Sequence, residues 1–306
     1  MPRSEPVPSP LTLANAVRQT AEALRIAGID DPLAEARRLV AAAAGVEPLD
    51  LVTAPNRPLD TQIAARIADY AARRSAHEPL SRILGCRAFY GRDFWLSADT
   101  LDPRPETEGL VDMVLDLYAK PSRVGYPIEI LDIGTGTGAI IVTLLAELPM
   151  ARGWGIDISA NALVTAGRNA ARHSVAERVN FLLHDLRDGL DVQRSGEGYV
   201  YDFIVSNPPY IASGELGTLP AEVRLHDPVV ALDGGADGLD FYRLLAASMA
   251  MLAPDGWMVV EVGAGQSAMV AELFQTMAPG ADIRTAKDLA GHTRIVAAQP
   301  RPHSSG

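Results

Sequence analysis

The sequence lacks the features that mark several classes of protein. Its single cysteine, Cys86, excludes an internal disulfide and a cysteine-based zinc site. It has no apolar run of about 18 residues, as a membrane-spanning helix needs, and it opens without the apolar stretch of a secretion signal. None of its 6 histidines lies in a metal-ligand spacing such as H-E-x-x-H. These absences predict a cytoplasmic protein with no membrane contact and no bound metal.

Basic charge is also scarce. The chain has 27 lysines and arginines against 38 aspartates and glutamates, which gives a net charge of −11. Proteins that grip nucleic acid through many phosphates usually carry a basic patch. The paired arginines Arg37-Arg38 and Arg73-Arg74 fall in helix-like segments, so we interpret them as solvated helix faces. No direct nucleic-acid binding is therefore expected.

Apolar residues are plentiful, at 48% of the 306 positions, which is enough for one large domain or two. In the N-terminal part they recur with the period of an amphipathic helix. The predicted helices cover residues 11–28, 31–45 and 60–76. Asp31 and Asp60 are the expected caps at the start of the second and third helices. We predict an all-helical N-terminal domain over residues 1–78.

Residues 79–100 differ in character. Two apolar runs, Arg82-Ile83-Leu84 and Phe94-Trp95-Leu96, flank a segment that contains turn-forming glycines. Such runs predict a β-hairpin, here a linker between two domains. The third and largest segment, residues 101–306, begins with a proline-rich loop and a helix expected over residues 106–118.

From residue 128 onward, strand-like and helix-like segments alternate. The predicted strands cover residues 128–133, 153–157, 179–184, 203–206, 257–262, 282–287 and 293–298. The predicted helices between them cover residues 139–148, 159–173, 239–252 and 266–277. This alternation predicts an α/β fold with a mainly parallel, doubly wound sheet.

A glycine-rich turn, residues 134–138, joins the first strand of this alternation to the first helix. Glycines let the backbone approach a ligand closely, and a helix N-terminus presents free N–H groups. Asp157 ends the next strand and could accept hydrogen bonds from both hydroxyls of a ribose. The pattern predicts a nucleoside-containing cofactor. It fits a nicotinamide cofactor and S-adenosylmethionine equally well, and a glycine turn without a ligand stays a third possibility.

The most informative motif is Asn207-Pro208-Pro209-Tyr210, directly after an apolar strand. The prolines cannot donate hydrogen bonds, so their carbonyls stay available, and the Asn207 amide offers one acceptor and two donors. We call residues 207–210 the Asn207 corner. These residues suit a planar group that carries an NH2, such as an amide or an amino-purine. On its own, Asn-Pro also marks a plain strand-terminating turn.

The third strand ends at Asp185 and Leu186. Asp185 could accept from the amino group of adenine, and Leu186 could pack on the ring. Asp185 as the cap of a turn is an equally good interpretation.

Several motifs of the sequence together resemble those of a known family. It is similar to the HemK/PrmC glutamine-N5 methyltransferases over almost its full length. The motifs that carry the resemblance are residues 78–85, Pro103-Arg104-Pro105-Glu106-Thr107-Glu108, the turn at 134–138, residues 207–210, Ala231-Leu232-Asp233-Gly234-Gly235, Asp237-Gly238-Leu239 and residues 288–294.

The resemblance implies a class I S-adenosylmethionine-dependent methyltransferase fold with a Rossmann-like seven-stranded sheet. It implies methyl transfer to the glutamine of the Gly-Gly-Gln motif in peptide chain release factors, the expected partners. Together with Asp185, the expected cofactor-binding residues are Gly134, Thr135, Gly136, Thr137, Gly138, Asp157, Leu186 and Asn207. The expected catalytic residues are Asn207, Pro208 and Tyr210. The expected substrate-binding residues are Asn207, Pro208, Pro209 and Tyr210.

Three other functions stay open on the residues. A DNA adenine-N6 methyltransferase would also present an NH2 to the Asn207 corner, although the acidic charge counts against it. A nicotinamide-dependent oxidoreductase would use the same glycine turn but leaves the double proline unexplained. A catalytically silent adaptor that binds S-adenosylmethionine is the third.

Overall fold

A computed structural model describes residues 11–119, 125–190 and 201–301. The chain divides into two compact units, Met1–Gly85 and Cys86–Gly306. The linker predicted over residues 79–100 is therefore shared between the two units. No helix of the described residues combines the length and the apolar character needed to cross a membrane.

The first unit is helical, as its periodicity predicts. Its helices are α1 (Leu13–Ile26), α2 (Pro32–Ala44), α3 (Asp50–Thr53), α4 (Thr61–Ser75) and α5 (Leu80–Leu84). The predicted caps are confirmed, because the side chains of Asp31 and Asp60 accept hydrogen bonds from the third residue after each. Gly45 ends α2 with a φ of +63°, a conformation that glycine adopts without strain.

Helix α5 corrects one prediction. Arg82-Ile83-Leu84 was expected to be the first strand of the hairpin, but these residues lie in α5. Leu80, Ile83 and Leu84 stand at the three- and four-residue spacing of a helix face, and Ile83 is buried. The hairpin starts just after Gly85, with β1 (Cys86–Phe89) paired antiparallel to β2 (Arg92–Trp95).

The hairpin is packed into the second unit. Phe89 and Phe94 are buried in the same core cluster as Leu110 and Val114. The backbone of Trp95 both donates to and accepts from the Asn169 side chain, at 2.8 and 3.0 Å.

A seven-stranded sheet forms the centre of the second unit, in the order β5-β4-β3-β6-β7-β9-β8. The strands are β3 (Glu129–Ile133), β4 (Arg152–Asp157), β5 (Val179–Leu183), β6 (Tyr201–Ser206), β7 (Leu252–Glu261), β8 (Asp282–Lys287) and β9 (Thr293–Gln299). β3 to β7 run parallel, and β9 runs antiparallel to both of its neighbours. The mainly parallel, doubly wound sheet is therefore confirmed.

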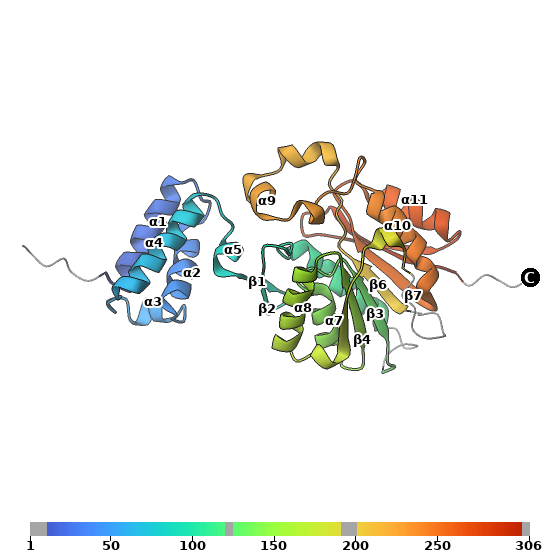
Figure 1. The fold of residues 1–306 in the computed structure, drawn as a ribbon, viewed down its shortest axis with the longest axis horizontal. Coiled ribbons are helices and arrows are strands. Elements are labelled where there is room, and N and C mark those ends of the chain that lie inside the picture. Colours follow the sequence, from blue (N-terminus) through green and yellow to red (C-terminus); the bar gives the residue numbers. More distant parts are fainter. Residues whose placement is uncertain (1–10, 120–124, 191–200, 302–306) are drawn as a thin grey trace, which may run out of the picture. The chain divides into compact units, whose positions relative to one another are not determined.

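Helices cover both faces of this sheet (Figure 1). They are α6 (Glu108–Tyr118), α7 (Ala139–Glu147), α8 (Ala160–Arg172), α10 (Asp240–Ser248) and α11 (Ser267–Met277). The short helix α9 (Ala221–His226) buries none of its side chains. Alternate residues of the central strands face opposite sides. Phe203 and Val205 join the core cluster of α6 and α7, whereas Ile204 joins that of α10 and α11. The helix predicted over residues 239–252 ends at Ser248, and β7 begins at Leu252 rather than 257.

Candidate active site

A cavity of about 810 Å³ opens at the carboxyl ends of β3, β4 and β6. The strand order reverses here: β4 and β5 lie on one side of β3, and β6 and β7 lie on the other. Ligands of open α/β sheets bind at such switch points. The cavity is thus the place where this fold favours a binding site.

The glycine turn forms one wall of the cavity. Gly134, Gly136 and Gly138 have φ values of +72°, +54° and +78°, which other residues adopt only with strain. The N–H groups of Gly134 and Thr135 both donate to the Ile156 carbonyl, at 2.9 and 3.0 Å. Neighbouring strands and the turn's own backbone thus hold its shape. Residues 134–137 line the cavity, whereas Gly138 is not among the described residues that do.

Asp157 lines the cavity beside this turn. One carboxylate oxygen accepts from the N–H of Gly136 at 2.8 Å, and the other accepts from that of Ser159 at 2.9 Å. Each oxygen has a second lone pair, so the group can accept further hydrogen bonds. Burial raises the pKa of the Asp157 carboxyl, and the backbone N–H groups of Ser159, Gly136 and Ile158 oppose that shift.

Asp185 and Leu186 also line the cavity. The Asp185 carboxylate is already bound, because the Arg187 guanidinium donates to both of its oxygens and the Arg187 N–H donates at 3.0 Å. Hydrogen bonding from Arg187 lowers the pKa of Asp185. Asp185 therefore caps a turn, as one of the two interpretations expects, and a role toward adenine stays a prediction.

The Asn207 corner forms a further part of the wall. Asn207, Pro208 and Pro209 line the cavity, but Tyr210 is not among the described residues that do. The Tyr210 ring packs instead against the core cluster of α10 and α11. Burial raises the pKa of its phenol to about 12, so it is neutral near pH 7. Its predicted packing against a substrate amide stays a prediction.

Two buried side chains to which the sequence analysis gave no role hold the Asn207 amide. Its Nδ2 donates to the Thr107 hydroxyl at 3.1 Å, and this hydroxyl donates to Oε2 of Glu261 at 2.5 Å. Thr107 and Glu261 are 4% and 2% exposed, so water does not compete for these bonds. Among the described residues, Oδ1 of Asn207 accepts no hydrogen bond.

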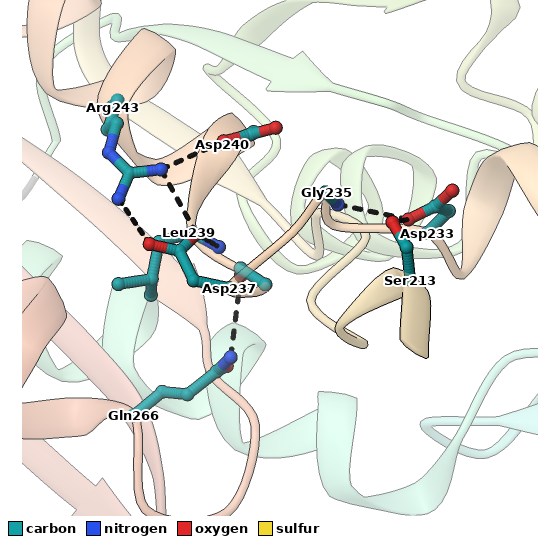
Figure 2. Close-up of polar contacts among 9 residues, drawn as sticks. Ser213, Asp233, Gly235, Asp237, Leu239, Asp240, Arg243 and Gln266 are labelled. Atoms are coloured by element: carbon teal, nitrogen blue, oxygen red, sulfur yellow. Dashed lines mark hydrogen bonds and ion pairs between the residues drawn. The ribbon is translucent and has the colours of Figure 1, made fainter. Parts of the chain in front are cut away.

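The segment from Val229 to Leu244 supplies a further part of the wall, to which the sequence analysis gave no site role, and Asp99, Leu101 and Pro103 also line the cavity. Figure 2 shows its internal contacts: the Arg243 guanidinium bridges Asp237 and Asp240, and Asp233 accepts from Ser213 and from the Gly235 N–H. The Asp-Gly-Gly and Asp-Gly-Leu-Asp motifs were the available signal, because glycine pairs mark close backbone approaches.

No group of three or more His, Cys, Asp or Glu side chains in the described part of the chain could hold a metal ion. The described lining of the cavity carries backbone groups, the Asn207 carboxamide and the carboxylates of Asp99, Asp157, Asp185, Asp233 and Asp240.

The strand order, the glycine turn and the cavity define a class of protein, the class I methyltransferases. A family model described as a methyltransferase domain matches residues 127–233. The fold resembles the hMettl16 catalytic domain, with a TM-score of 0.54 and 17% identity, covering 77% of this chain and 83% of the other. It also resembles a human methyltransferase 10 domain containing protein, with a TM-score of 0.50 and 19% identity over 76% and 96% of the two chains.

Sequence relatives narrow the class. A model of the PrmC N-terminal domain matches residues 15–85. The release factor glutamine methyltransferase of Caulobacter vibrioides is 40% identical over 96% of this chain and 99% of its own. That of Agrobacterium fabrum is 45% identical over 89% and 92%. The chain belongs to the release factor glutamine methyltransferase family, which confirms the resemblance seen in its motifs.

Proposed function

We propose that this protein transfers a methyl group from S-adenosylmethionine to the side-chain amide nitrogen (N5) of the Gly-Gly-Gln glutamine in peptide chain release factors. The family membership supports the reaction and the substrate class. The observation that carries the chemistry is the Asn207 corner, where a carboxamide with an unused acceptor lies on the wall of a cavity beside a glycine turn. Release factors act on ribosomes, so the cytoplasm is the proposed place of action.

The residues of the cavity fit the proposed cofactor. The Asp157 carboxylate keeps acceptor capacity for ribose hydroxyls, and Ile158 and Leu186 offer apolar surface for a ring. Residues 134–137 bring backbone close to the cavity without side chains at the glycine positions. When bound, S-adenosylmethionine supplies the methyl carbon: the new N–C bond forms as the C–S bond breaks, and the sulfur leaves as a neutral thioether.

The substrate nitrogen is a weak nucleophile, because its lone pair is delocalised into the amide carbonyl. Acceptor groups that take hydrogen bonds from its N–H groups return electron density to the nitrogen and fix the direction of its lone pair. Asn207 Oδ1 and the Pro208 carbonyl are the proposed acceptors. Nδ2 of Asn207 donates one of its two N–H groups to Thr107, which fixes the orientation of the amide and leaves its oxygen unused for the substrate. The methylated nitrogen then loses its proton to water.

Orientation of the two reacting groups contributes more to the rate than the hydrogen bonds to the nitrogen do. A single neutral hydrogen bond contributes about 1 kcal/mol, whereas holding two reacting groups in line contributes up to about 7–11 kcal/mol. We therefore assign the corner mainly to positioning. Tyr210 and Gly138 stay proposed members of the substrate and cofactor sites.

The deciding experiment incubates the protein with S-adenosylmethionine and a release factor and locates the added methyl by mass spectrometry. We expect a single methyl on the glutamine of the Gly-Gly-Gln peptide. Duplex DNA runs in parallel, because adenine would also fit an acceptor corner. Methyl transfer to DNA adenine, with an unmodified release factor, would replace this function by its nearest rival.

We also propose that residues 1–78 select the protein substrate, since the cavity residues all lie in the second unit. Removal of residues 1–78 should spare S-adenosylmethionine binding and abolish methylation of the release factor. Methylation at the rate of the full chain would refute this role.

A further inference from the structure

The Asn207 amide and the Glu261 carboxyl stand at equivalent positions in neighbouring strands. β6 and β7 pair in parallel with Ser206 opposite Val260, so Asn207 and Glu261 are the next residues along each strand. Thr107 reaches the same place from the short helix Pro105–Thr107. All three belong to the second unit, and their hydrogen bonds form one buried chain.

The polarity of this chain follows from what each group can donate. An ionised carboxylate only accepts, so the single proton of the Thr107 hydroxyl must go to Glu261. The hydroxyl is left with lone pairs alone, and only the NH2 end of Asn207 can bond to them. An ionised Glu261 therefore fixes the orientation of the Asn207 carboxamide, which is two hydrogen bonds away.

We propose that Glu261, acting through Thr107, is a positioning residue that keeps Oδ1 of Asn207 available to accept from the substrate amide. The inference rests on the proposed function, in which Asn207 must present an acceptor. It assigns roles to two residues that act through Asn207: Thr107 lines the cavity, whereas Glu261 is not among the described residues that do.

Protonation of Glu261 would release this constraint. A carboxylic acid can itself donate to Thr107, which frees the Thr107 proton to donate to Oδ1 of Asn207 and lets the amide turn over. Burial raises the pKa of Glu261 to about 7, so the two states exchange near neutral pH.

The groups around Glu261 do not mask this titration. Glu106 raises its pKa, while Arg294 and Arg104 lower it. The two arginines are paired with Asp288 and Asp227, at 3.1 and 2.7 Å. Burial raises the pKa of the phenols of Tyr210 and Tyr242, so both stay neutral through this range.

The first test is the pH profile of methylation for four proteins. In the wild type, kcat/KM should rise with pH through about 7, because the ionised form of Glu261 is the active one. Thr107→Ser keeps the hydroxyl and should keep this step. Thr107→Val should lose about 10-fold in kcat with cofactor affinity unchanged, and Glu261→Gln should lose the step. A step that survives in Glu261→Gln would belong to Asp132, whose pKa burial also raises to about 7, and would overturn the assignment.

Thr143→Val is the matched control. Thr143 is fully buried, and its hydroxyl makes no hydrogen bond among the described residues. The same substitution there should leave kcat and its pH profile as in the wild type. An equal loss in both variants would mean that burying valine, rather than breaking the chain of bonds, lowers activity.

The second test needs no methylation. In protein labelled with 15N-asparagine, the side-chain NH2 signals of Asn207, assigned by their loss in Asn207→Ala, should shift with pH around 7. The shift should be absent in Thr107→Val and in Glu261→Gln. If it occurs in a protein that does not methylate release factors, the positioning holds and the proposed function fails. If the signals are unchanged across this range, the positioning itself is wrong.

Discussion

The glycine turn and the Asn207 corner are neighbours built in opposite ways. Both follow the carboxyl ends of adjacent parallel strands, β3 and β6. The turn is held by backbone hydrogen bonds to the next strand and by three glycines with positive φ. The corner is held by side chains of Thr107, Glu261 and Gln266, which come from distant parts of the chain.

This difference separates what each region controls. The turn shapes a surface, so damage to it should change how tightly a cofactor binds. The corner orients a functional group, so damage to it or to its supports should change turnover with little effect on binding. Substitutions in the turn should therefore change cofactor affinity, and substitutions in the corner should change kcat.

The largest expected effect tests the corner directly. Asn207→Ala removes the proposed acceptor and should lower kcat by about 10²- to 10³-fold, as removal of one preorganised polar group does in other active sites. Calorimetry, run beside the turnover assay, should find a much smaller change in cofactor affinity than in kcat. Asn180→Ala, at an exposed position of β5, is the control for asparagine loss. Full turnover in Asn207→Ala would end the proposed mechanism.

The second prediction tests the turn. Asp157→Ala removes the acceptor for Gly136 and for the proposed ribose, and a hydrogen bond to a charged group contributes about 1.5–3 kcal/mol. Cofactor affinity should fall about 10- to 100-fold, while kcat at saturating cofactor falls much less. Asp60→Ala also deletes a carboxylate that accepts a backbone N–H, but far along the sequence, at the cap before α4. Asp60→Ala should lower stability and leave cofactor affinity unchanged. If both variants lose the same cofactor affinity, the loss in Asp157→Ala comes from impaired folding.

The third prediction concerns the glycine that packs against the corner. A Cβ at Gly238 would overlap the Tyr210 carbonyl oxygen, and its φ is +74°. Gly238→Ala should displace the end of the motif and lower kcat about 10-fold. Gly291 has a φ of +86° and nothing within 4 Å of a Cβ, so Gly291→Ala imposes the backbone strain alone. If both variants turn over equally, the close approach to Tyr210 has no function.

The same contrast explains which parts of the site the sequence reveals. The turn and Asp157 form a local pattern with a fixed spacing, so both could be predicted to face one site. The alternation of apolar segments likewise predicted the strands and the parallel sheet. Thr107 lies in a motif that carries the family resemblance, but neither its role nor that of Glu261 could be predicted this way, because nothing in the sequence shows that the two side chains meet at the end of β6 and β7.

The smallest expected effect tests a support of the corner that leaves every cavity residue in place. Nε2 of Gln266 donates to the Tyr210 carbonyl at 2.9 Å and to that of Gly238 at 3.4 Å, while its Oε1 accepts from the Gly263 N–H. Figure 2 shows Gln266 reaching toward the segment that carries Asp237 and Leu239. Gln266→Glu keeps the acceptor and replaces the donor by a carboxylate oxygen. The loss of one hydrogen bond of about 1 kcal/mol predicts a fall of about 5-fold in kcat with unchanged cofactor affinity.

Gln299→Glu is the matched control for this last variant, because Gln299 also donates from Nε2 to a backbone carbonyl, that of Asp255, at 2.8 Å. It should reduce stability by a similar amount and leave kcat unchanged. If Gln266→Glu weakens cofactor binding instead of turnover, the two regions are mechanically coupled. The division between a turn that binds and a corner that orients would then be wrong, since a support of one would be acting on the other.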